Sequence, residues 1–134
     1  MNKAIVDQLI VRMESYLECW KQFNTFMTMA RNKKFSPEDE SQFLEIKSVL
    51  AQELELILAN IDCGPITRED VHILMSSAPS IRYLSEINEG NLRNLENQWH
   101  KLFIGWQSIL GQLKVRQGTM EGRTLASWFK RKVA

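Results

Sequence analysis

The sequence has 134 residues, of which 44% are hydrophobic and 25% charged, and its formal net charge is +1. This length fits one domain that can bury its own core, and this composition is typical of a folded soluble protein. The near-neutral charge excludes a global electrostatic attraction to nucleic acid or membranes. Only three prolines and six glycines occur, which favours helices over sheets.

Residues 2–31 form the first expected helix, because apolar residues recur there at alternating spacings of three and four. This heptad pattern is typical of coiled coils and of helices that pack at a shallow angle. Ile5, Ile10 and Leu17 widen the apolar stripe, so we expect the helix to contact two partner helices. The pattern itself consists of Val6, Leu9, Met13, Tyr16, Trp20, Phe23, Met27 and Ala30.

A second helix is expected over residues 37–63. Ser36 can cap its first turn, and Pro37 suits the first helical position because it lacks the N–H that would be unpaired there. Gly64 can adopt a left-handed conformation after the helix, and Pro65 cannot continue it. Because the first helix is expected to end at residue 31 and the second to begin at residue 37, the connection between them is short.

The second half of the chain predicts three further helices. A short helix spans residues 67–76, and a long helix spans 79–117 with a possible kink at Gly90. Gly118 is expected to end the long helix, and an amphipathic helix follows over residues 120–132. The long helix has a second heptad pattern, made of Leu92, Leu95, Trp99, Leu102, Trp106, Ile109 and Leu113.

Together these elements predict an all-α fold, an elongated antiparallel bundle of three long helices with the short and C-terminal helices as accessories. We divide the chain into a bundle domain, 1–118, and a C-terminal segment, 119–134. The first helix and the helix over 79–117 are expected to run parallel, with their midpoints at one level. An aromatic layer should then form from Tyr16, Trp20, Phe23, Trp99, Phe103 and Trp106.

The charge is unevenly distributed along the chain. Residues 38–62 contain seven acidic residues and one basic residue, whereas residues 114–134 contain six basic residues and one acidic residue. Most acidic helix faces are simply solvated, but this one could also dock the basic segment or a basic partner.

Motifs for catalysis, metals and cofactors are sparse. Glu69 and His72 have the Glu-x-x-His spacing of carboxylate-bridged metal sites, but the only other histidine, His100, lacks a glutamate at that spacing. Cys19 and Cys63 should lie about 20 Å apart along the bundle axis, too far for a disulfide. We therefore predict no catalytic residue, no metal site and no cofactor.

The C-terminal segment is the strongest candidate for a contact surface. Basic residues alternate there with aromatic and aliphatic ones, as in helices that insert into a partner groove or lie on an anionic membrane. In the alternative interpretation its apolar residues fold back and cover one end of the bundle. Four cations are fewer than nucleic-acid binding domains usually present, so nucleic acid is not expected. The predicted contact residues are Arg123, Leu125, Trp128, Phe129, Lys130, Arg131 and Lys132.

The sequence therefore predicts a non-enzymatic interaction module that acts as an adaptor, an assembly factor or a chaperone-like protein. Its partner would be another protein or a second copy in a homodimer. The alternatives are a peripheral membrane protein anchored by the C-terminal segment and a small helical metal protein. A cytoplasmic location is expected, because no apolar stretch approaches a membrane span and charged residues interrupt the N-terminal region.

Overall fold

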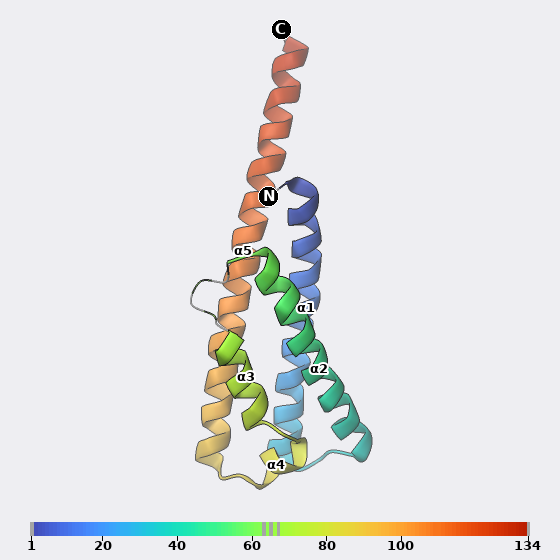
Figure 1. Ribbon diagram of the computed structural model, residues 1–134, viewed down its shortest axis with the longest axis vertical. Coiled ribbons are helices and arrows are strands. Elements are labelled where there is room, and N and C mark those ends of the chain that lie inside the picture. The colour runs from blue at the N-terminus through green and yellow to red at the C-terminus, as the bar shows by residue number, and fades with distance from the viewer. Residues whose placement is uncertain (1, 63, 65, 67, 134) are drawn as a thin grey trace.

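The computed structural model describes residues 2–62, 64, 66 and 68–133, and their side chains as far as residue 121. These residues form five helices and no strand: α1 (Lys3–Asn32), α2 (Pro37–Asn60), α3 (Arg68–Ser77), α4 (Ile81–Glu86) and α5 (Glu89–Val133). The all-α prediction is therefore confirmed. Figure 1 shows an elongated molecule in which α5 is the longest element.

Local capping explains where α1 and α2 begin and end. The side chain of Asn2 accepts a hydrogen bond from the N–H of Ile5, and Lys33 ends α1 in a left-handed conformation. Ser36 and Asp39 form a reciprocal capping box at the start of α2. The prediction that Ser36 caps this helix is confirmed. The helix ends at Asn60 rather than at residue 63, because the next residue is already extended.

Two predicted boundaries in the second half of the chain are wrong. The helix over 79–117 is two helices, because Ile87 is extended and Asn88 caps a new start by accepting from the N–H of Asn91. Gly118 does not end a helix: α5 continues without a break through the predicted last helix, 120–132. A glycine costs only about 1 kcal/mol inside a helix, and no proline follows it to prevent continuation. The division into 1–118 and 119–134 stays a prediction.

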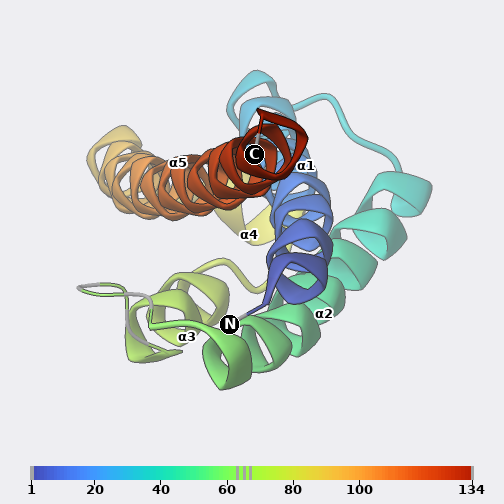
Figure 2. The same cartoon turned by 90° about the horizontal axis from the view of Figure 1, so that it is seen from above.

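The helix α1 packs against α2, α4 and α5. In Figure 2, α2 and α5 flank it and α3 lies between α2 and α5, and Figure 1 shows α4 at the end where α1 finishes. All eight residues of its heptad pattern are buried, as are Ile10 and Leu17, whereas Ile5 is 39% exposed. The heptad residues of α5 are buried as well.

Ion pairs and hydrogen bonds fix the relative directions of the helices. Lys3 lies 3.9 Å from Glu121 at one end, and Arg31 lies 2.6 Å from Glu96 toward the other. The numbering thus rises along α1 while it falls along α5, so these two helices are antiparallel (Figure 1). The predicted parallel arrangement is wrong. The short helix α3, which was expected to be only an accessory element, reverses the direction of the chain once more before α5.

The predicted aromatic layer is present. The rings of Tyr16 and Trp106 meet edge to face with centroids 5.2 Å apart, and Trp20 lies 6.1 Å from Tyr16 in the same geometry. The indole of Trp99 donates a 2.8 Å hydrogen bond to the carbonyl of Trp20 and stacks on Phe103. Aligning the midpoints of α1 and α5 gives the same aromatic layer whether the two helices run parallel or antiparallel. The layer was therefore predicted correctly although the direction of α5 was not.

Gly105 allows the connector between α2 and α3 to pack closely against α5. A Cβ on Gly105 would lie 2.5 Å from Cδ1 of Ile66, a buried residue of the connector between α2 and α3. At Gly111, six residues further along the same helix, a Cβ would meet no heavy atom within 4 Å.

The two glycines give a matched test of this packing. Gly105→Leu should destabilise the protein by about 1–3 kcal/mol, because the new side chain overpacks the site of Ile66. Gly111→Leu should be neutral or stabilise it by up to about 1 kcal/mol through helix propensity. Urea unfolding followed by circular dichroism measures both. Equal effects of the two substitutions would contradict the assigned close contact.

Candidate functional site

The predicted contact residues belong to a helix that leaves the bundle. The side chains of Arg123, Leu125, Trp128, Phe129, Lys130, Arg131 and Lys132 lie outside the described residues, but their backbone is the last part of α5. The amide of Gln117 donates a 2.7 Å hydrogen bond to Asp7, and Glu121 reaches Lys3 in the first turn of α1.

Beyond Glu121, α5 therefore extends past the start of α1 (Figure 1). The alternative in which the segment folds back over the bundle is wrong, because the helix does not turn. The same direction takes the backbone of the segment away from α2 (Figure 1).

The acidic part of α2 is largely explained by contacts within the chain. Glu53 pairs with Arg12 of α1 at 3.4 Å. Glu55 accepts two hydrogen bonds from Arg68 of α3, at 2.6 and 2.7 Å. This hydrogen bonding is the main cause of a lowered pKa at Glu55, and the positive charge of Arg68 acts in the same direction. These acids join α2 to its neighbours, so the cluster need not be a binding site.

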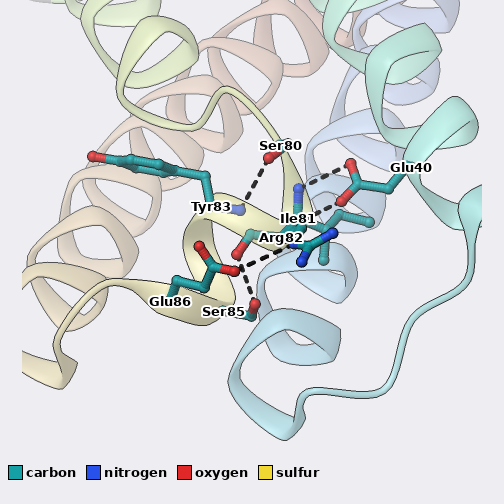
Figure 3. A network of polar contacts seen from close by, with 7 residues as sticks. All are labelled: Glu40, Ser80, Ile81, Arg82, Tyr83, Ser85 and Glu86. Carbon is teal, nitrogen blue, oxygen red and sulfur yellow. Dashed lines mark hydrogen bonds and ion pairs between the residues drawn. The ribbon is translucent and has the colours of Figure 1, made fainter.

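Glu40 has a further structural role, shown in Figure 3. Its carboxylate accepts hydrogen bonds from the backbone N–H groups of Ile81 and Arg82, at 3.1 and 2.7 Å, and so caps the start of α4. Two turns further along α2, Lys47 donates a 2.8 Å hydrogen bond to the carbonyl of Ala78, and burial lowers the pKa of this lysine. Both contacts hold the junction between α3 and α4 against α2.

The metal interpretation gains no geometric support. Glu69 and His72 are both exposed on α3, and His100 is exposed on α5. Among the described residues, no three histidine, cysteine, aspartate or glutamate side chains come together as a metal-binding group.

Cys19 lies in a groove between α1 and α2, beside the Arg12–Glu53 ion pair. It is half-buried and a free thiol. Burial raises its pKa, and the negative charges of Glu53 and Glu18 raise it further. This environment disfavours the reactive thiolate. Cys63 lies outside the described residues, so the predicted separation of the two cysteines is not tested.

Sequence reasoning missed an exposed face of α5, near the point where the helix leaves the bundle. We call this surface the α5 face. Val115, in its centre, is 71% exposed. Gly111 and Gly118 were a sign of this surface in the sequence, because almost any other residue would stabilise a helix more than glycine does. A Cβ at either position would meet no heavy atom within 4 Å. The residues of this face are Ser108, Gly111, Gln112, Val115, Arg116, Thr119 and Met120.

Comparisons with known proteins add no assignment. No protein-family model matches the sequence, no curated protein matches it, and no solved structure matches the fold. In the described part of the chain, no helix is both long enough and apolar enough to cross a bilayer.

The contact between Glu40 and α4 predicts a specific loss of stability. Glu40→Ala should cost about 1–2 kcal/mol, because it removes a cap from two backbone N–H groups. Glu45→Ala, on an exposed position of the same helix, should change stability by less than about 0.5 kcal/mol. Thermal unfolding of both variants measures the difference. A Glu40 variant as stable as the Glu45 control would refute the capping role.

The raised pKa of Cys19 predicts slow alkylation. In a Cys63→Ser background, iodoacetamide should react with Cys19 severalfold more slowly than with glutathione near neutral pH, and the rate should rise as the pH approaches the raised pKa. Glu53→Gln should accelerate the reaction because it removes a negative charge beside the sulfur. Glu14→Gln is the control. Equal rates in both glutamate variants would contradict the electrostatic cause.

Proposed function

We propose that this protein is a non-enzymatic interaction module that binds another protein through the C-terminal part of α5. The observation that supports this most directly is that α5 continues beyond the first turn of α1, where the ion pair of Lys3 with Glu121 is the outermost contact described between the two helices. A helix that leaves its own bundle is available to a groove or helix of another molecule.

The composition of the projecting segment supports the same proposal. Residues 122–133 contain four basic residues and no acidic one, together with the large apolar residues Leu125, Trp128 and Phe129. Aromatic residues and arginine are enriched at protein interfaces, where aromatic side chains bury much apolar area. We place this activity in the cytoplasm as part of the proposal.

Peripheral membrane binding is the second candidate, because a basic helix with a tryptophan and a phenylalanine also suits an anionic bilayer surface. A helix of about 12 residues with four cations binds membranes only weakly unless a second anchor assists it. The protein partner is therefore the function that we favour.

Truncation after Glu121 tests the proposal. Residues 2–121 should keep their helices in the shortened protein, which should unfold within about 4 °C of the full chain, because the described contacts with α1 remain. It should lose a partner that the full-length protein captures. Loss of binding to phosphatidylglycerol vesicles with unchanged partner capture would favour the membrane candidate instead.

A substitution pair separates side-chain contacts from helix length. Trp128→Ala combined with Phe129→Ala should reproduce the loss of capture, since it removes the apolar area of the segment. Thr124→Ala combined with Ser127→Ala, a matched control in the same segment, should bind as the full-length protein does. Unfolding of the truncated protein would show that the segment belongs to the core, and the proposal would fail.

A further inference from the structure

A pocket lies between α3, the connector that precedes it and the middle of α5. We call it the α3–α5 pocket, and Figure 1 shows α3 alongside this part of α5. Its volume is about 400 Å³, within the range of about 300–1,000 Å³ that is usual for small-molecule sites. Ile66 lies at one end, where Gly105 lets it pack on the backbone of α5. Three separate segments of the chain therefore build the pocket.

The walls of the α3–α5 pocket suit an apolar chain. Along α5 the pocket extends from Gln98 to Gly105, which is about 10 Å of helix. Ile66 and Leu102 are buried, whereas Ile73 of α3 is 47% exposed, so the apolar wall reaches the surface. A ligand with an apolar chain would remove this exposed area from water, which favours binding.

The ammonium of Lys101 is the charge of the pocket that the fold leaves unused. No described residue forms an ion pair or a hydrogen bond with it. By contrast, Lys114, further along the same helix, lies 3.9 Å from Glu14. Lys101 is exposed, so a carboxylate that pairs with it stays partly hydrated and avoids most of the cost of burying a charge. An ammonium beside an apolar wall therefore favours a carboxylate that carries an apolar chain.

Asp70 carries the opposite charge in the same pocket and already has a role in the fold. It belongs to the first turn of α3, where the helix dipole stabilises an acidic side chain, and it takes part in a contact elsewhere. Its carboxylate repels a second anionic group placed near it. The pocket should therefore prefer a ligand with one carboxylate to a ligand with two.

We propose that the α3–α5 pocket binds a small monocarboxylic acid with an unbranched apolar chain. The carboxylate of the ligand pairs with Lys101, and its chain lies against Ile66, Ile73 and Leu102. Such a ligand joins α3 to α5 and so stabilises the folded state. This site is independent of the proposed function, because it uses no residue beyond Glu121.

Octanoate is the probe, because its chain is about as long as the pocket. Octylammonium has the opposite charge, and suberate is the dicarboxylate of the same length. Chemical-shift changes in the amide NMR spectrum of the full chain, titrated with each probe, measure affinity and position. Octanoate should bind about fivefold more tightly than either counterpart, with the changes concentrated in residues 68–77 and 98–105. Affinities of octanoate and octylammonium within about twofold of each other would overturn the proposal, and so would an equal affinity for suberate.

Two lysine variants test the charge. Lys101→Gln should weaken octanoate binding about fivefold, because it removes the ammonium that pairs with the carboxylate. Lys114→Gln, the same change on the same helix outside the pocket, should weaken it less than about twofold. Equal effects of the two substitutions would mean that only overall charge matters, and the pocket would not be the site.

Two glutamate variants test the apolar wall. Ile73→Glu should weaken octanoate binding about tenfold or more, because it places a negative charge where the chain lies. Leu44→Glu, at an exposed position of α2 outside the pocket, should bind as the unchanged protein does. If circular dichroism shows that Ile73→Glu alters the fold, Gln98→Glu replaces it. Octanoate binding that is unaffected by the substitution in the pocket would refute the site.

Truncation after Glu121 separates this proposal from the proposed function. The shortened protein should bind octanoate as the full chain does, whatever the truncation does to partner capture. Loss of octanoate binding on truncation would place the site in the C-terminal segment and overturn the assignment to the α3–α5 pocket.

Discussion

The fold depends on the burial of α1 on several sides at once. Tyr16 illustrates this constraint within one residue: its hydroxyl donates a 3.0 Å hydrogen bond to the carbonyl of Leu50 on α2, and its ring packs against Trp106 of α5. Since α2 and α5 make few direct contacts with each other, α1 sets their separation and α3 fills the space between them (Figure 2). A change at the centre of α1 therefore acts on the whole bundle.

The sequence predicted what depends on neighbouring residues. The capping box of Ser36 and Asp39 needs only residues three apart, and the buried faces of α1 and α5 follow from helical periodicity. Gly118 shows the limit of such local rules. Glycine is common after helix ends, but its cost inside a helix is about 1 kcal/mol, and the surrounding helix overcomes this cost.

Features that join distant parts of the chain could not be predicted in this way. Glu40 caps a helix that begins 41 residues later, and Glu55 pairs with Arg68 across a turn. From sequence alone these acids formed only an acidic stretch, since no local pattern names the partner of a surface glutamate. The direction of α5 was missed for the same reason, because it depends on how a ten-residue helix, α3, reverses the chain.

The two parts of α5 have different physical roles, and its glycines distinguish them. At Gly105 the absence of a side chain lets Ile66 pack against the backbone of α5. The buried apolar area of Ile66 offsets the lower helix stability of glycine. At Gly111 and Gly118 the helix gives up the same stability, although a Cβ there would meet no described heavy atom within 4 Å. The core ends where α1 begins, yet the helix continues, and its charge becomes almost entirely basic. A helix that is stabilised by the bundle along one part and left uncovered along the next is held rigidly at its base. In the proposed function, that rigidity lowers the entropy cost of binding a partner at the exposed part.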